Sequence, residues 1–457
     1  MGVMSGSYVW SSICRQTLHP ASLSGRGSTI RALVHGGRGH WFRVLSATKL
    51  LRINHFYPAQ RSIPMNPESL GLRPVWAEVD LDRLAHNMRE VRRVVPRSAR
   101  VMACVKADGY GHGAPEAAEA FLGSGADMLA TATLDEAVQL RRLGFDAPML
   151  CLGYVPEYLH GRLLEHGVGA TIYRLEHARA LSEAAMGAGV EAVVHVKLDT
   201  GMGRLGLPVT EETVGQVEEI SRMRGIVLEG LFTHFAVADE ADKAYTRMQF
   251  ERFMEVAGAL ERRGVHVPIR HVSNSAAIID LPEYSLDMVR PGIMLYGFYP
   301  SPHVNHGRVS LKPAMALKAM VSHVKRVPAG TGISYGLTYV TPGPRDIATI
   351  PAGYADGYRR GLSNLGGVGL GGERAPVVGR VCMDQFMVDA TGLDVKVGDT
   401  AVLWGDGSGG EPDVEEVAGW LGTITHEVVC GVSRRVPRVY VKNGEVVGVR
   451  DYLNPEL

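Results

Sequence analysis

Between Val101 and Ile293, short apolar runs alternate with amphipathic helical patterns, and this alternation constrains the fold more than any other feature. Eight runs occur: Val101–Lys106, Met128–Thr131, Met149–Gly153, Ala170–Tyr173, Val194–Asp199, Leu228–His234, Arg270–Asn274 and Met288–Ile293. Parallel strands that are covered on both faces are apolar throughout rather than alternating. The pattern predicts an α/β fold, a (β/α)8 barrel of the TIM type. An open doubly wound sheet is disfavoured because no strand leads into a glycine-rich dinucleotide turn.

After Gly297 the sequence changes character. Stretches rich in β-formers, separated by Gly, Pro and Asp turns, replace the alternation: Ala319–Val327, Asp346–Ile350, Val377–Val388, Thr400–Leu403 and Arg438–Val441. Only Val414–Leu421 has a clear helical pattern, and the glycine-rich Gly366–Gly372 predicts a hairpin rather than a phosphate loop. We expect the barrel over residues 75–305, with residues 75–80 forming a strand that joins a mainly β C-terminal domain over 312–457.

Residues 1–64 differ from the rest in charge. They hold eight basic and no acidic residues, so in a chain with 48 of each the remainder carries about −8. We expect an unstructured leader, either a transit peptide or an over-long start with Met65 as the true first residue; the latter is favoured because globular patterning begins abruptly at Val75. The acidic remainder argues against nucleic-acid partners, and no apolar stretch reaches the roughly 18 residues of a membrane span.

The cysteines bear on compartment and metal binding. There are five, widely separated: Cys14, Cys104, Cys151, Cys382 and Cys430. They match neither metal-ligand spacing nor a disulfide framework. We therefore expect no metal site and a reducing, cytoplasmic location.

Several polar residues fall at the carboxyl ends of the predicted strands, where barrel enzymes place their active sites. They are Lys106, Arg204, His234, Asn274, Ser275 and Arg290. An amine at a barrel mouth can form a Schiff base with an aldehyde cofactor, although a lysine at a strand end is also explained by snorkelling. The glycines that follow Lys106 let the backbone approach a ligand closely.

The segment Val105-Lys-Ala-Asp-Gly-Tyr-Gly-His112 resembles the cofactor-lysine motif of alanine racemases. Seven further segments resemble motifs of that family, in order: Leu198-Asp-Thr-Gly-Met-Gly-Arg204, Phe232-Thr-His-Phe235, Ser273-Asn-Ser-Ala276, Val289-Arg-Pro-Gly292, Gly332-Ile-Ser-Tyr-Gly336, Gly353-Tyr-Ala-Asp-Gly357 and Val381-Cys-Met-Asp-Gln-Phe386. The resemblance runs from Trp76 to about Tyr440. It implies a barrel plus a β domain, the cofactor pyridoxal 5'-phosphate, and a homodimer whose active sites are shared between subunits.

By this resemblance, Lys106 holds the cofactor and acts as one acid/base, and Tyr335 of the second subunit acts as the other. Racemisation removes a proton from one face of a planar carbon and returns one to the opposite face, so two groups on opposite sides suffice. Free lysine and tyrosine have pKa values of about 10. The site must therefore lower at least one of these pKa values.

The resemblance also assigns the remaining site residues. The cofactor-binding positions are Lys106, Tyr110, Arg204, His234, Asn274, Ser275, Arg290, Gly292, Ile293 and His426, and the substrate-binding positions are Arg204, Met383, Asp384 and Tyr354. In this assignment Arg290 faces the pyridine nitrogen, supported by His271, and cannot accept a proton as a carboxylate would. Hydroxyls and backbone amides suit the phosphate. Lys197 supports Arg204 at a position that can be carbamylated.

One departure leaves the substrate open. Ile424-Thr-His-Glu-Val428 carries His426 where the family usually has a tyrosine. Interconversion of L- and D-alanine for peptidoglycan is the expected function, with a broad-specificity or serine racemase as the alternative. A non-catalytic pyridoxal-phosphate-binding homeostasis protein resembles the barrel alone, without the residues beyond Lys312. A fold-related decarboxylase is expected to carry a catalytic cysteine and a carboxylate where Arg290 stands.

Overall fold

The computed structural model describes residues 70–455, and the predicted leader over residues 1–64 lies outside them. Eight parallel strands form the first sheet, in the order β10-β2-β3-β4-β5-β6-β8-β9. Their bounds are β2 (Arg100–Cys104), β3 (Met128–Thr131), β4 (Met149–Cys151), β5 (Gly169–Ile172), β6 (Ala192–Asp199), β8 (Ile226–Phe232), β9 (Ile269–His271) and β10 (Met288–Val289). The short β7 (Leu207–Pro208) pairs with β6.

The first and last strands of this sheet approach each other and nearly close it. The Asp287 amide donates to the Arg270 carbonyl at 3.1 Å, and the Arg290 amide donates to the Ser273 carbonyl at 2.9 Å. These bonds join the β9 and β10 segments, whereas β10 also pairs with β2. The predicted (β/α)8 barrel is confirmed, and each of the eight apolar runs overlaps a strand.

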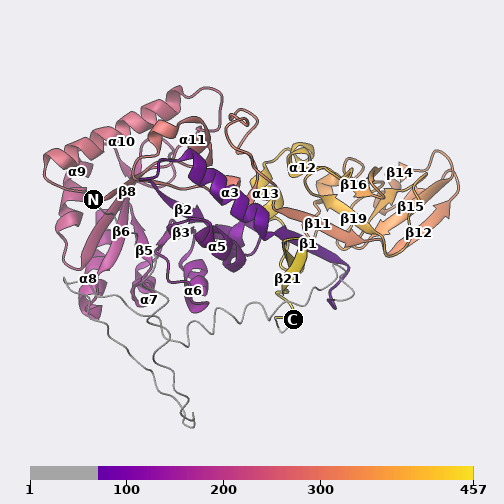
Figure 1. The fold of residues 1–457 in the computed structure, drawn as a ribbon, viewed down its shortest axis with the longest axis horizontal. Helices are drawn as coiled ribbons and strands as arrows, with labels where there is room; N and C mark the ends of the chain where they lie inside the picture. The colour runs from indigo at the N-terminus through magenta and orange to yellow at the C-terminus, as the bar shows by residue number, and fades with distance from the viewer. Residues whose placement is uncertain (1–69, 456–457) are drawn as a thin grey trace, which may run out of the picture. The chain divides into compact units, whose positions relative to one another are not determined.

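Helices follow the strands and cover the outside of the barrel (Figure 1). They are α3 (Leu81–Val94), α5 (Ala114–Gly123), α6 (Leu134–Arg142), α7 (His160–Glu165), α8 (Leu175–Ala188), α9 (Glu211–Arg222), α10 (Ala244–Arg262) and α11 (Ser275–Asp280). Local sequence sets their ends: Thr133 and Glu136 form a capping box on α6, and Gly189 ends α8 in the left-handed region. None of the helices in residues 70–455 is long and apolar enough to cross a membrane.

The C-terminal part is mainly β, as predicted. A seven-stranded sheet has the order β17-β16-β19-β11-β1-β20-β21, beside a three-stranded sheet β12-β15-β18 and the pair β13-β14. The bounds are β1 (Val75–Asp80), β11 (Met315–Met320), β12 (His323–Val327), β13 (Gly332–Ile333), β14 (Tyr339–Val340), β15 (Arg345–Ile350), β16 (Gly367–Leu370), β17 (Glu373–Pro376), β18 (Phe386–Asp389), β19 (Thr400–Trp404), β20 (Arg438–Lys442) and β21 (Glu445–Arg450). The glycine-rich stretch forms the predicted hairpin, between β16 and β17.

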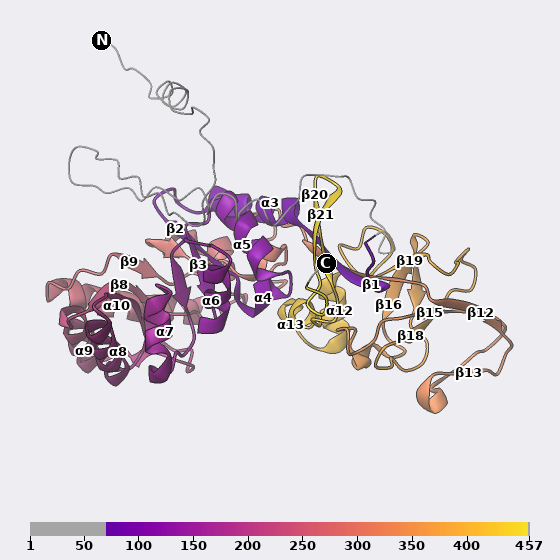
Figure 2. The same cartoon turned by 90° about the horizontal axis from the view of Figure 1, so that it is seen from below.

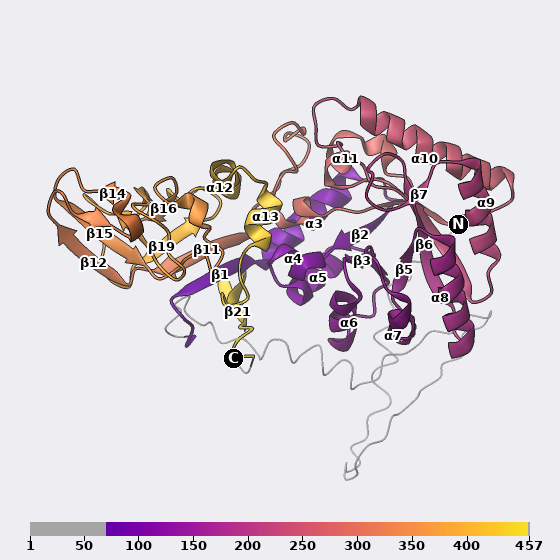
Figure 3. The ribbon, with the colours of Figure 1, turned by 180° about the vertical axis from the view of Figure 1, so that it is seen from behind.

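Segments from both ends of the described chain meet in the seven-stranded sheet. Strand β1 runs antiparallel to β11 and parallel to β20 (Figure 2). The helix α12 (Val414–Leu421) is present as predicted, and α13 (Thr425–Cys430) follows it. α13 contacts the segment after β2 (Figure 3), so the C-terminal part reaches the mouth of the barrel.

Candidate active site

Lys106 lies at the barrel mouth, immediately after β2, and begins the short helix α4 (Lys106–Tyr110). The backbone at 107–110 is left-handed, with φ between 51° and 60°. One turn of helix forms in this hand, because the Gly109 amide donates to the Val105 carbonyl at 2.9 Å and the Gly111 amide donates to the Ala107 carbonyl at 3.0 Å. A left-handed conformation costs a non-glycine residue roughly 1–2 kcal/mol. Such strain persists only where the surroundings hold it.

The charges of four cationic side chains act on His234: Lys106, Lys197, Arg204 and Arg290. Burial and then these charges hold the pKa of the His234 imidazole well below its usual range. Burial, followed by the charges of Arg204 and Arg290, lowers the pKa of Lys197 to about 8. The cluster carries an excess of positive charge that suits an anionic ligand. Among residues 70–455, no group of three His, Cys, Asp or Glu side chains is arranged to hold a metal ion.

Within this cluster, Arg290 is only 4% exposed and is held by several hydrogen bonds. Its Nη1 donates to His271 Nδ1 at 2.9 Å and to the His271 carbonyl at 2.8 Å. Its Nη2 donates to the Thr233 carbonyl at 2.7 Å and approaches His234 Nδ1 at 3.3 Å. Burial lowers the pKa of the guanidinium to about 10, so Arg290 keeps its charge at neutral pH.

The hydrogen bonds of Arg290 continue through two buried histidines. His271 Nε2 lies 2.8 Å from His195 Nδ1, and His195 Nε2 lies 2.9 Å from a carboxylate oxygen of Glu229. Because a guanidinium only donates, His271 accepts at Nδ1 and donates from Nε2. His195 then accepts at Nδ1 and donates to Glu229. Both imidazoles are thereby fixed in one neutral tautomer.

A cradle of small and hydroxyl-bearing residues lies beside Lys106. The Gly292 amide donates to Ser275 Oγ at 2.9 Å. A Cβ at Gly292 would meet Tyr110 Oη at 2.6 Å and Ser275 Oγ at 3.9 Å, so glycine keeps this space free. Asn274 caps α11, and Ile293 begins the 3-10 helix η3 (Ile293–Tyr296). Two hydroxyls around a backbone amide suit a phosphate group.

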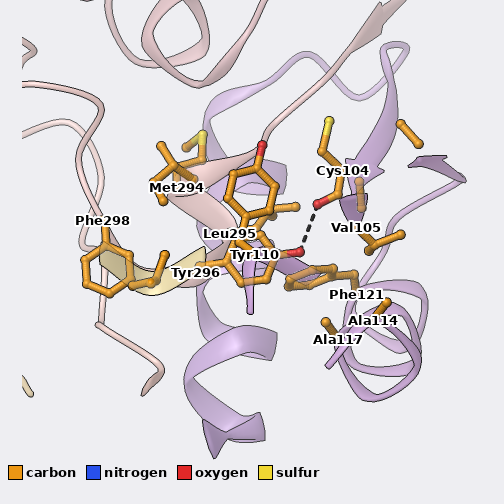
Figure 4. Close-up of a cluster of buried hydrophobic side chains, with 14 of the residues drawn as sticks. Cys104, Val105, Tyr110, Ala114, Ala117, Phe121, Met294, Leu295, Tyr296 and Phe298 are labelled. Carbon is orange, nitrogen blue, oxygen red and sulfur yellow. Dashed lines mark hydrogen bonds between the residues drawn. The ribbon is translucent and has the colours of Figure 1, made fainter. Parts of the chain in front are cut away.

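Tyr110 is positioned by the core beneath it. Its ring packs on Tyr296 with centroids 4.7 Å apart, and the Tyr296 hydroxyl donates to the Cys104 carbonyl at 2.9 Å (Figure 4). Phe121 stacks edge-on against Tyr296. This packing fixes Tyr110, four positions after Lys106, against the end of β2.

His426, on α13, lies near Tyr110. Its ring centroid lies 6.0 Å from that of Tyr110. Burial, and then the charge of Lys106, lowers the pKa of His426 to about 4. Its buried Nδ1 has no hydrogen-bond partner within the described residues. At neutral pH the imidazole is therefore uncharged, and its Nδ1 is available to a ligand.

The other predicted site residues lie on the C-terminal domain and are exposed: Tyr335, Tyr354, Met383 and Asp384. Tyr335 is 71% exposed and begins the 3-10 turn η4 (Tyr335–Leu337). Tyr354 and Met383 lie on adjacent loops, because the Tyr354 amide donates to the Cys382 carbonyl at 3.1 Å. Within residues 70–455, no hydrogen bond, ion pair or ring contact joins these four residues to the barrel cluster.

Sequence reasoning missed His195 and Glu229. The signal was present, because His195 and Lys197 are two residues apart on β6 and side chains two apart share a face of a strand. Gly230, opposite His195, was a second sign. A Cβ there would meet His195 Nδ1 at 2.0 Å, so only glycine leaves room for this imidazole.

The chain is similar to alanine racemases along both parts. Residues 79–300 match the family model "Alanine racemase, N-terminal domain", and residues 314–440 match "Alanine racemase, C-terminal domain". It is 47% identical over 384 residues to the alanine racemase of Clostridium tetani, covering 84% of this chain and 99% of that protein. It is 51% identical over 369 residues to that of Desulforamulus reducens, covering 80% and 99%.

Solved structures give the same result. The alanine racemase of Clostridium difficile 630 has a TM-score of 0.80 and 45% identity, covering 83% of this chain and 99% of that one. The alanine racemase of Bacillus anthracis with bound L-Ala-P has a TM-score of 0.79 and 37% identity, covering 84% and 98%.

Proposed function

The chain belongs to the alanine racemase family of pyridoxal-phosphate-dependent isomerases, and from that membership we propose that Lys106 and Tyr335 are its two proton-transferring groups. The observation that carries this proposal is the position of Lys106, which follows β2 on a strained turn and lies within a cluster of cations around neutral His234. Strain and a shared electric field at one lysine are typical of a functional site.

The residues at the barrel mouth fit the cofactor. The phosphate would lie against Tyr110, Ser275 and the Gly292–Ile293 backbone, in the space that a Cβ at 292 would fill. When bound, pyridoxal phosphate supplies an aldehyde for an amine and a ring that withdraws electrons from the α-carbon. Arg290 would face the ring nitrogen with a fixed charge that cannot take up a proton. Electron withdrawal into the ring is then weaker than with a carboxylate, which disfavours side reactions.

Two groups on opposite faces allow racemisation without rotation of the substrate. Lys106 Nζ would hold or accept the α-proton on one face, and Tyr335 Oη would do so on the other. His234 would polarise this hydroxyl, and Arg204, supported by Lys197, would hold the phenolic oxygen of the cofactor.

Tyr335 would come from a second copy of the chain, so we infer a homodimer with shared active sites. The C-terminal domain supports this inference, because segments that hydrogen-bond to one another expose large apolar side chains: Tyr335, Leu337, Val340, Tyr354, Leu365 and Met383. Exposed apolar residues of this size favour a partner surface. In that assembly Tyr354 would line the substrate entrance, and Met383 and Asp384 would approach the substrate carboxylate.

The physiological setting follows from the same proposal. We propose that the enzyme works in the cytoplasm and supplies D-alanine for peptidoglycan, and the five scattered cysteines fit a reducing compartment. A broader substrate range is the second candidate, favoured by the neutral His426 in place of a tyrosine near the phosphate cradle.

The direct test is to incubate the purified protein with D-alanine and pyridoxal phosphate and to measure L-alanine by chiral chromatography. A panel with serine and other amino acids separates the two candidates. Conversion of alanine alone supports the first candidate, and comparable conversion of serine supports the second. A protein that binds the cofactor and converts no amino acid would overturn both.

A further inference from the structure

The left-handed turn at 107–110 carries Tyr110 and follows Lys106 directly, so its geometry sets where both side chains point. Its own backbone bonds do not explain why a strained form persists, since a relaxed right-handed turn would make equivalent bonds. Contacts from outside the turn must therefore select it. The described residues place these contacts on the last strands of the chain.

Asp108, in the middle of the turn, is held from two sides. Its Oδ1 accepts a hydrogen bond from the Ala114 amide at 3.0 Å, at the start of α5. Its Oδ2 accepts one from the hydroxyl of Tyr452. Tyr452 lies beyond β21 and beyond residue 440, where the family match ends. The segment after β21 thus contacts the turn through the Asp108 carboxylate.

Arg438 holds the end of the same turn. This side chain is 1% exposed, and its Nε donates to the Gly111 carbonyl at 2.9 Å. Its other nitrogens donate to backbone carbonyls of 432, 433 and 436 at 2.6–2.9 Å. The ring of Tyr452 lies 5.3 Å from the guanidinium carbon of Arg438, which is a cation–π distance. Tyr452 therefore touches both residues that hold the turn.

A partly buried ion pair fixes the strand that leads to Tyr452. Arg450 Nη2 lies 2.6 Å from Glu116 Oε1, and Arg450 Nε lies 3.2 Å from each carboxylate oxygen. Glu116 belongs to the first turn of α5, next to the amide that Asp108 accepts from. Two paired N–H groups on one carboxylate restrict the orientation of both partners. The ion pair with α5 thus positions Tyr452, and Tyr452 positions the backbone of residues 107–110.

We propose that Tyr452, acting through Asp108 and Arg438, is a positioning residue that holds Lys106 and Tyr110 in their productive orientation. The inference rests on the proposed function of Lys106 as the cofactor lysine. Tyr452 touches no reacting atom and does not bind substrate. Its loss should weaken the hold on the cofactor and leave the global fold intact.

The test is Tyr452→Phe, which removes the hydroxyl and keeps the ring over Arg438. The dissociation constant for pyridoxal phosphate, from titration of cofactor-free protein, should rise roughly tenfold or more, as for one hydrogen bond to a charged group. Hydrogen exchange of the Gly109 and Gly111 amides should accelerate by a similar factor, while exchange in α8 stays unchanged. Tyr158→Phe, at a tyrosine that is 84% exposed, is the matched control and should change neither quantity.

A double-mutant cycle separates positioning from general stability. If Tyr452 acts through the carboxylate, Tyr452→Phe should add little to cofactor affinity in an Asp108→Asn background. The proposal is overturned if Tyr452→Phe changes only the melting temperature, or if its effect is the same in both backgrounds. Its failure differs from failure of the proposed function: Lys106→Ala protein that kept the visible absorbance of bound cofactor would remove Lys106 from its assigned role, yet the exchange of the turn would still report on Tyr452.

Discussion

The barrel mouth and the exposed face of the C-terminal domain differ in how complete they are within one chain. At the barrel mouth, Arg290 is 4% exposed, and its guanidinium donates hydrogen bonds to His271 and to the Thr233 carbonyl. On the C-terminal face, Tyr335 is 71% exposed and its side chain lies free of the barrel cluster. One region fixes its predicted site residues within a single chain, and the other leaves its predicted site residues exposed and without a contact to the barrel cluster.

Both regions contain left-handed backbone, and bonds within the chain hold each of them. The turn at 107–110 is surrounded by buried bonds from α5 and the C-terminal tail. Beside Tyr335, Ser334 has φ of 65° and Leu337 has φ of 47°, and Ser334 Oγ donates to the Arg380 carbonyl at 2.6 Å. The barrel turn is fixed by its own chain. Under the proposed assembly, cofactor binding is therefore a property of one chain, whereas racemisation needs two.

Replacement of the barrel lysine should give the largest effect. Lys106→Ala should lower kcat about 10³-fold or more, because one general acid/base typically contributes 10²–10⁴-fold and the attachment to the cofactor is lost as well. The visible absorbance of the bound cofactor should disappear too. Lys325→Ala, at an exposed lysine of β12, is the control. If the Lys106→Ala protein still racemised alanine, Lys106 would not be one of the proton-transferring groups.

Removal of the Tyr335 phenol should lower kcat nearly as much, but only through the proton transfer on one face of the substrate. Tyr335→Phe should lower kcat about 10²-fold or more, while cofactor absorbance and melting temperature stay unchanged, because this exposed side chain has no partner in the barrel of its own chain. Exchange of solvent deuterium into the two alanine enantiomers should become strongly unequal. Equal and unimpaired exchange would take Tyr335 out of the chemistry.

A pH series sharpens the description of the barrel as a charged, preformed site. Burial beside Arg204 and Arg290 lowers the pKa of Lys197 from 10.5 to about 8. Between pH 8 and pH 10.5 the Lys197 amine is protonated in the unfolded chain and neutral in the folded chain, so the free energy of unfolding rises with pH. Below pH 8 the amine is charged in both states, and the full cost of burying that charge lowers the free energy of unfolding. Lys197→Met should raise the melting temperature of cofactor-free protein at pH 7, and the gain should shrink toward pH 10. A lower melting temperature at pH 7 would instead indicate a carbamate on Lys197.

The smallest effect is expected at the residue that departs from the family. His426→Tyr should leave the fold intact and change the dissociation constant for pyridoxal phosphate, or the kcat/KM ratio of serine to alanine, within about tenfold, as for one hydrogen bond. Titration of the cofactor and a substrate panel measure the two quantities. If neither moved by more than twofold, the imidazole would be neutral to function.

Sequence patterns predicted the barrel well because they depend on strong local signals. Fully apolar stretches such as Val101–Val105 have few alternatives to a buried parallel strand. The helix α13 was missed because six residues give too little periodicity. The Glu229–His195–His271 chain was missed for another reason: its members come from different strands, and only the closed barrel brings them together.

The barrel residues of the candidate site were expected together because strand ends converge in this fold. The left-handed turn after Lys106 was not foreseen, since Ala107 gives no signal for a positive φ and Asp108 gives only a weak one. Nor was the contact of Tyr452 with Asp108, which joins residues 344 positions apart. Long-range selection of a strained backbone is a tertiary effect that local propensity does not encode.

Complementation between two inactive variants tests the shared site most directly. Lys106→Ala and Tyr335→Phe chains are co-expressed with different tags, and the mixed dimer is purified and assayed for racemisation of alanine. If each site takes its lysine from one chain and its tyrosine from the other, the mixed dimer regains one intact site, about half the wild-type kcat per dimer. Activity no higher than that of either parent would contradict a site shared between two chains.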